Sequence, residues 1–379
     1  SCPKNPWKDF ASYKSTDARY FKGREESIAK FLRIVDADTM SVLYASSGIG
    51  KTSFIQAGIV PIMMERGYAP IQILFNDDDF AEGVDLSMLL KLHVEDEIKK
   101  HNENEDKIKK EKKKQNEDYT TNKWGWNSLL DVQSEEIGQL IKDLDKVSLW
   151  WKFHTCEIRT ESGQSLKPLL LLDQFEEIFV KAKAKNIQLQ TFFDELEELA
   201  SNNLPSEVET ILNQLANQGV FFDLDTYHHY KIIFSLRKEY LSDFDYWTND
   251  RHSIAELQQN RMLLLPLSRN KAMKVIIEQP LNLDGSKCYT TLNNIAEEIL
   301  NVIDDKKRNE IEPFILSVLC SRLYDRSVGL GKTELKPDDL NTYSASTIIR
   351  EFYEQKMQSI IPKHSHITRM SPLENVALF

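Results

Sequence analysis

Short apolar runs separated by polar, helix-forming segments set the pattern of this chain. Three continuous runs, Ser41–Ala45, Leu169–Leu172 and Tyr230–Leu236, have the length of strands that are covered on both faces of a sheet. Pro70–Phe75 predicts a further strand, and the segment from Lys51 to about Gly67 predicts a helix that ends at a glycine. The succession of strand, turn, helix and strand indicates a βαβ unit, whose crossover makes its strands parallel.

Helical periodicity is clear near the start of the chain. Ile28, Phe31, Leu32 and Val35 fall at i, i+3, i+4 and i+7, which gives the segment Ser15–Asp36 one apolar face. Acidic residues near its start suit the positive end of a helix. We therefore expect an amphipathic helix before the first strand.

The last third of the chain loses the strand signal. Beyond Leu267 the apolar positions recur at helical spacing, after two earlier helices at Ile187–Ala200 and Glu207–Gln218. The helices predicted in this last part are Lys271–Gln279, Leu292–Ile303, Pro313–Tyr324 and Ser346–Ile361. The change from alternating strands and helices to helices alone predicts a domain boundary near residues 265–270.

A charged stretch interrupts the alternation between about Asp77 and Ser165. Val94–Asp118 is dense in Lys, Glu, Asp and Asn, which is typical of a solvated helix or a mobile insertion. Acidic residues interleave with the lysines, so a basic nucleic-acid surface is the less favoured interpretation. Lys152–Lys167 alternates polar and apolar positions around a Ser-Gly pair, which predicts a hairpin.

Composition narrows the class of protein. The chain has 379 residues, of which 41% are hydrophobic, so it has enough apolar material for two or three domains and is not wholly disordered. A net charge of −11 argues against a general nucleic-acid binder, and no apolar run reaches the ~18 residues that cross a bilayer. The four scattered cysteines suggest neither a zinc site nor a disulfide framework, so we expect a cytoplasmic protein. The chain opens at Ser1 without Met or a signal peptide, and we expect a segment of a longer protein.

The turn after the first apolar run carries the strongest chemical signal. Ala45–Thr52 follows the phosphate-loop pattern G-x-x-x-x-G-K-[ST], with Ala45 in place of the first glycine and an additional glycine at Gly48. Backbone N–H groups can point at a phosphate there because glycines accept unusual φ angles. Lys51 would then bridge two phosphates and Thr52 would bind Mg²⁺. The alternative is a glycine-rich turn that only caps a helix. The phosphate-binding residues predicted in this loop are Ser47, Gly48, Ile49, Gly50, Lys51, Thr52 and Ser53.

A second signal follows the run of four leucines. Asp173 ends that predicted strand, as in a Walker B motif, and would hold Mg²⁺ together with Thr52. Glu176 and Glu177 lie on the following turn, where either could polarise an attacking water. The sequence leaves the choice open, with a slight preference for Glu177.

Other polar residues give weaker signals. Arg237 ends the strand at Tyr230–Leu236 and could sense the γ-phosphate, or could pair with a nearby carboxylate on the surface. The histidines at 228–229 and at 364 and 366 lack partners at metal-ligand spacing. The acidic residues at 77–79 are better explained as a loop cap than as metal ligands.

With these motifs in place, the chain resembles the novel STAND branch of the signal-transduction ATPases, which is related to the NACHT and NB-ARC ATPases. The resemblance rests on several separated motifs: Asn5-Pro6-Trp7, Tyr20–Glu25, Ser47–Phe54, Asp173–Glu177, Phe234–Leu241, Ile277–Leu281 and Glu312–Leu316. It implies that Asn5-Pro6-Trp7, Gly23 and Arg24 lie by adenine and ribose, that Arg237 is the sensor and that Pro313 contacts adenine. Asp173, Glu176, Glu177 and Arg237 are the implied catalytic residues.

The resemblance also implies an architecture and a function. We expect an α/β P-loop NTPase with a mostly parallel central sheet flanked by helices, followed by an all-α helical lid. The expected parts are an N-terminal segment with the Gly-Arg-Glu motif (1–40), the ATPase core (41–265, with the insertion at about 77–165), the lid (266–361) and the start of a winged helix (362–379). The family binds ATP and ADP with Mg²⁺ and self-associates on activation. It works with effector and sensor modules, and a protein trigger, viral in some systems, activates it in bacterial antiviral defence or programmed cell death.

The residues alone leave two other classes of protein open as alternatives. A P-loop kinase or remodelling motor would need an acceptor pocket, or an arginine finger with a basic channel, and the sequence indicates neither. An interaction module that holds ADP and turns over little would keep the same motifs. Both are alternatives to the regulatory ATPase.

Overall fold

The computed structural model describes residues 5–9, 11–81, 86–115, 117–128, 134–201, 204–222, 230–249, 255–280, 290–291, 293–304 and 309–336. They fall into two compact units, which we call the core unit and the lid unit. The core unit contains residues 14–18 and 25–265, and the lid unit combines the chain from Pro266 onward with residues 5–13 and 19–24. The predicted N-terminal segment 1–40 is therefore divided between the two units. The predicted helix Ser346–Ile361 and the predicted start of a winged helix at 362–379 lie outside the described residues.

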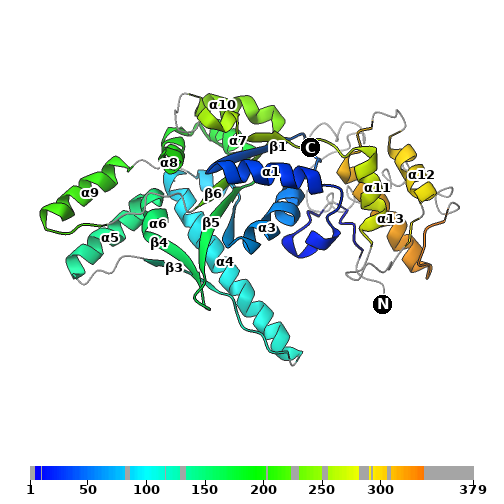
Figure 1. Ribbon diagram of the computed structural model, residues 1–379. Helices are drawn as coiled ribbons and strands as arrows, with labels where there is room; N and C mark the ends of the chain where they lie inside the picture. The colour runs from blue at the N-terminus through cyan, green and yellow to red at the C-terminus, as the bar shows by residue number, and fades with distance from the viewer. Residues whose placement is uncertain are drawn as a thin grey trace, which may run out of the picture. The chain divides into compact units, whose positions relative to one another are not determined.

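A mixed, mostly parallel sheet organises the core unit (Figure 1). Its strands are β1 (Met40–Ala45), β2 (Tyr68–Ile73), β3 (Trp124–Ser128), β4 (Cys156–Thr160), β5 (Ser165–Leu172), β6 (Lys231–Arg237) and β7 (Arg261–Leu263). The parallel strands run in the order β2-β5-β6-β1-β7, with pairs such as Ile71↔Leu170 and Val42↔Phe234 in register. The predicted α/β fold class is confirmed.

Two antiparallel strands extend the sheet beside the start of β5. Strand β4 pairs with β5 through Ile158↔Leu166, and β3 pairs with β4 through Trp126↔Ile158. The predicted hairpin around residues 162–163 is present, and Gly163 has a φ of 88° in its turn. Its first strand begins at Cys156, whereas Lys152–Thr155, predicted as part of the hairpin, belong to a helix. Strand β3 was not predicted, because its sequence Trp-Gly-Trp-Asn-Ser has neither a continuous apolar run nor a regular alternation.

Helices flank the sheet of the core unit (Figure 1). They are α1 (Glu25–Ala37), α2 (Lys51–Ser53), α3 (Val60–Glu65), α4 (Leu86–Lys114), α5 (Glu135–Val147), α6 (Leu149–Thr155), α7 (Glu176–Lys185), α8 (Gln190–Ser201), α9 (Ser206–Asn217) and α10 (Leu241–Thr248). A π-helical stretch, Phe54–Ile59, joins α2 to α3, so that one helical segment follows the glycine-rich loop. The predicted charged helix is α4, whose buried residues near its start pack against β2.

The hydrophobic core of this unit centres on β5 and β6, which are nearly continuous apolar strands. Residues Leu169–Leu172 are each no more than 1% exposed, as expected for strands covered on both faces. Phe175 lies three residues after the end of this strand and is fully buried among aromatic rings, at centroid distances of 5.1 Å to Phe234 and 5.6 Å to Phe179. This packing fixes the turn that carries the second predicted motif.

The lid unit has a separate core. Its helices are α11 (Arg269–Glu278), α12 (Asn293–Ile303) and α13 (Pro313–Gly329). Trp7, from the N-terminal residues, is 4% exposed and packs edge-on against Tyr324 with ring centroids 5.8 Å apart. Within the described residues, no helix of either unit is long and apolar enough to cross a membrane.

Candidate nucleotide-binding site

The loop between β1 and α2 has the conformation that the phosphate-loop pattern requires. Gly48 and Gly50 have φ angles of 79° and 87°, which residues with a Cβ atom rarely adopt. A Cβ atom built at either glycine would meet no protein atom within 4 Å, so the space beside this backbone is not filled by protein. Ser47 is exposed, and Ile49 is buried and anchors the loop. The loop is therefore a polar cradle at the start of a helix, which suits an anion.

Lys51 is the first residue of α2 and lies at the base of this loop. Its Nζ lies 3.4 Å from the carbonyl oxygen of Ala45, so the ammonium folds back toward the end of β1. Burial lowers the pKa of Lys51, while the carboxylates of Glu176 and Asp173 act in the opposite direction. A partly desolvated cation close to two carboxylates would gain from a polyphosphate, which supplies additional negative charge.

A hydrogen bond joins the two predicted motifs. Thr52 Oγ1 donates to Asp173 Oδ2 at 2.8 Å, and Asp173 is 3% exposed at the carboxyl end of β5. The other carboxylate oxygen of Asp173 accepts from the backbone N–H of Gln174 at 3.0 Å. A threonine hydroxyl and an aspartate carboxylate are oxygen ligands that Mg²⁺ accepts together with phosphate oxygens and waters. These two residues fit a magnesium site.

The two adjacent glutamates face different neighbours. Glu176 is 3% exposed, and its carboxylate accepts from the backbone N–H of Arg237 and pairs with Arg237 Nε, each at 3.1 Å. Glu177 is one-third exposed and lies 3.9 Å from Lys181 Nζ. The structure thus brings Lys51, Glu176 and Arg237 to the carboxyl ends of three adjacent strands and turns Glu177 toward a different loop.

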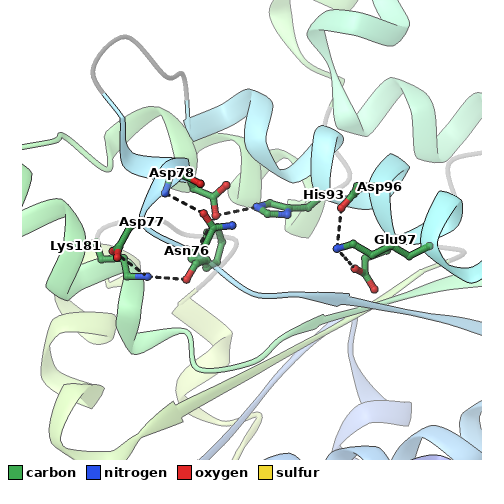
Figure 2. A network of polar contacts seen from close by, with 10 residues as sticks. Asn76, Asp77, Asp78, His93, Asp96, Glu97 and Lys181 are labelled. Carbon is green, nitrogen blue, oxygen red and sulfur yellow. Dashed lines mark hydrogen bonds and ion pairs between the residues drawn. The ribbon is translucent and has the colours of Figure 1, made fainter. Parts of the chain in front are cut away.

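That loop follows β2 and forms a polar network with α7 and α4 (Figure 2). Lys181 donates to the carbonyl oxygen of Phe75 at 2.9 Å and lies 3.5 Å from Asp77. Asp79 accepts from the backbone N–H of Asn76 at 2.7 Å, as a loop cap does, and its carboxylate lies 3.3 Å from His93 on α4. Asp79 thus acts as the loop cap predicted for the acidic residues 77–79, whereas Asp77 pairs with Lys181. The network links α7 to the start of the charged helix.

Gly23, Arg24 and Pro313, the remaining predicted site residues, belong to the lid unit. A Cβ atom at Gly23, where φ is 79°, would lie 2.7 Å from the carbonyl oxygen of Lys271, so the chain can approach α11 only with glycine here. Arg24 is 5% exposed, and burial lowers its pKa to about 10. Pro313 is the first residue of α13, a position that suits proline.

The predicted Asn5-Pro6-Trp7 motif has a visible structural role within the lid unit. Asn5 Nδ2 donates to the carbonyl oxygen of Ser321 at 3.1 Å and to Asp325 at 2.8 Å. The carbonyl oxygen of Pro6 accepts from Gln279 at 2.7 Å and from Tyr13 at 3.0 Å. These contacts hold the N-terminal residues on α11 and α13. The pattern could not predict them, because the partners are about 270 to 320 residues away in the chain.

Comparison with known proteins decides the family. The model of the family described as Novel STAND NTPase 1 matches residues 6–328, which is most of the chain. The chain belongs to this family. A search of curated proteins finds no significant match. The novel STAND resemblance predicted from the motifs is confirmed.

Three solved structures that are similar to this STAND NTPase share little sequence identity with it. The ORC2 protein of Aeropyrum pernix in its ADP form is 11% identical, with a TM-score of 0.44, covering 86% of this chain and 69% of that one. Cdc6p of Pyrobaculum aerophilum is 12% identical (TM-score 0.41, 86% and 67% covered), and a Walker-type ATPase of Pyrococcus abyssi is 13% identical (TM-score 0.41, 94% and 77% covered). At these scores the likenesses decide nothing about function.

Proposed function

We propose that this STAND NTPase binds ATP and ADP with Mg²⁺, hydrolyses ATP slowly, and acts as a nucleotide-dependent oligomerisation switch. The single observation that carries the proposal is the 2.8 Å hydrogen bond between Thr52 and Asp173, because it joins the loop for phosphate to the carboxylate for the metal. When bound, Mg²⁺ would neutralise charge that develops on the phosphates during hydrolysis. Thr52 and Asp173 would hold this ion.

Residues of the chain itself would bind the phosphates, the ribose and the adenine of the nucleotide. The backbone of residues 47–50 and the ammonium of Lys51 would bind the β- and γ-phosphates, and Ser53 would complete the loop. Arg237 would sense the γ-phosphate. Gly23, Arg24 and Pro313 are assigned to ribose and adenine by the family resemblance. This assignment is a prediction, which the affinity of variants of these three residues for adenine nucleotides would test.

The switch itself follows from the resemblance to STAND proteins. ADP would hold a resting form, and exchange for ATP would allow self-association and activation of a fused or associated effector. We place this switch in the cytoplasm, in bacterial antiviral defence or programmed cell death, with a protein trigger. The chain's charge of −11 does not favour nucleic acid as the partner of this segment.

Oligomeric state in defined nucleotides tests the proposal. We expect the full chain to be monomeric with ADP and Mg²⁺, and to shift toward a larger species with a slowly hydrolysed ATP analogue, as measured by light scattering after size exclusion. Asp173→Asn removes the metal ligand and should abolish that shift. A mass that is the same in both nucleotides, at concentrations that saturate binding, would contradict the switch and leave nucleotide binding untouched.

A further inference from the structure

The adjacent carboxylates Glu176 and Glu177 have different surroundings, and the order of the strands explains why. Helix α7 follows β5, which lies between β2 on one side and β6 on the other. Glu176 turns toward β6, whose last residue is Arg237, and β1 with the phosphate loop lies next to β6. Glu177 turns toward Lys181 and the loop after β2, on the side away from β1. Only one of the two acids therefore faces the phosphate loop.

Arg237 holds the Glu176 carboxylate with two separate donors. Its backbone N–H binds Oε2 and its Nε binds Oε1, each at 3.1 Å, and the Glu176 side chain is only 4% exposed. A carboxylate has about four lone-pair positions, so two acceptor positions remain for a water. The Arg237 side chain is 46% exposed, and its terminal guanidinium nitrogens make no hydrogen bond to any residue that the structure describes. One arginine can thus hold Glu176 and still offer donors to a phosphate.

We propose that Arg237 is a positioning residue that couples the γ-phosphate to Glu176, and that Glu176, not Glu177, orients the attacking water. The inference rests on the proposed function, since it assigns roles within the same site. The water oxygen forms a bond to the γ-phosphorus as the bond from that phosphorus to the bridging oxygen breaks. The bond's electron pair stays on ADP, and the water proton passes through Glu176 to the released phosphate.

The reaction does not depend on a strong base. Phosphoryl transfer passes through a loose transition state with little bond formation to the nucleophile, so correct placement of the water matters more than strong basicity. Two fixed hydrogen bonds to a buried carboxylate supply that placement. Arg237 would bind the γ-phosphate only when ATP is present, so it would also report the nucleotide state to the water-binding acid.

A double-mutant cycle in the full chain tests the coupling. Glu176→Gln should lower the single-turnover rate of ATP hydrolysis by about 10²–10⁴-fold. Arg237→Gln should lower it on the order of a hundredfold. In the Glu176→Gln background, Arg237→Gln should add less than about threefold, since both changes remove the same function. Losses that multiply would show that Arg237 acts independently of Glu176, and would overturn the proposal.

Binding measured in the same variants separates this proposal from the proposed function. ADP affinity, followed with a fluorescent ADP, should change by no more than about threefold in Glu176→Gln, because Glu176 acts on the water rather than on the diphosphate. Glu177→Gln should lose less activity than Glu176→Gln, and the reverse order would assign the water to Glu177. A wild-type chain that hydrolyses ATP, combined with losses in Glu176→Gln and Arg237→Gln that multiply, would refute the proposal alone. A chain that binds no nucleotide, or binds ATP without hydrolysing it, would refute the proposed function as well.

A matched control guards against misfolding. Arg261 and Asp245 form another arginine–carboxylate pair in the core unit, with Arg261 Nη1 3.2 Å from Asp245 Oδ1. Arg261→Gln and Asp245→Asn remove this pair outside the proposed site, and both should keep wild-type turnover. If Arg237→Gln does not fold, Arg237→Lys keeps the charge without the planar fork of donors, and the same non-additivity is expected of it.

Discussion

Phe175 offers a quantitative test of how the turn between Asp173 and Glu176 is held. Its ring is 0% exposed and lies within 6.2 Å, between centroids, of six other phenylalanine rings. Its backbone N–H also donates to Ser235 on β6 at 2.8 Å. Truncating a buried phenylalanine to alanine costs about 3–5 kcal/mol, because transfer free energy is lost and a cavity remains. We expect Phe175→Ala to fall in the upper half of this range, since the ring is enclosed on all sides by aromatic neighbours.

Urea unfolding followed by tryptophan fluorescence measures the loss. With a slope of about 2–3 kcal/mol per molar urea, the midpoint of the core-unit transition should fall by about 1.3–2.5 M. Phe221→Ala is the matched control, since Phe221 is 78% exposed and its truncation should cost less than about 0.5 kcal/mol. A shift below about 0.3 M for Phe175→Ala would mean that its aromatic neighbours do not support the turn, and the reasoning would fail.

Two further predictions concern other parts of the chain. Gly23→Ala should destabilise the lid unit by about 2 kcal/mol or more, since alanine is strained at a φ of 79° and its Cβ would lie 2.7 Å from a backbone oxygen. In thermal melting, Gly331→Ala should cost less, because φ is positive there but no atom lies within 4 Å. Burial, followed by repulsion from Glu195, Glu207 and Asp194, raises the pKa of Glu198 to about 7, above its value in the unfolded chain. The folded state is therefore penalised as pH rises from the unfolded pKa to above 7, so Glu198→Gln should stabilise the protein more at pH 8 than at pH 5 in urea titrations. An equal effect at both pH values would contradict this shift.

The strands that carry the site could be predicted from the sequence, because each is recognised from a pattern of a few consecutive residues. Residues Leu169–Leu172 and Ile232–Leu236 are covered on both faces, and such strands need continuous apolar residues. Gly50 and Lys51 are adjacent in the chain, so the phosphate loop is also a local pattern. The fold class and the family followed from these segments and their spacing.

Features that depend on tertiary structure could not be predicted in the same way. Nothing local distinguishes Glu176 from Glu177, and their different partners depend on the fact that β5 lies between β2 and β6. Strand β7 has only three residues and exists through its pairing with β1. The charged helix α4 could be predicted as a solvated helix. Its link to α7 could not, because the link depends on the loop after β2, where His93 lies close to Asp79 and Lys181 lies close to Asp77. Figure 2 shows this network.

Calorimetric titration of ADP with Mg²⁺ into the full chain and into Lys51→Ala tests the central claim most directly. The wild-type chain should bind one ADP, and Lys51→Ala should lose at least about 2 kcal/mol of binding free energy, or roughly thirtyfold in affinity, because a partly buried charge pair is broken. Lys30→Ala removes an exposed lysine on α1 and should bind like the wild type. If Lys51→Ala binds ADP as tightly as the wild-type chain does, or if neither binds it, the loop after β1 is not a nucleotide site and the account is wrong.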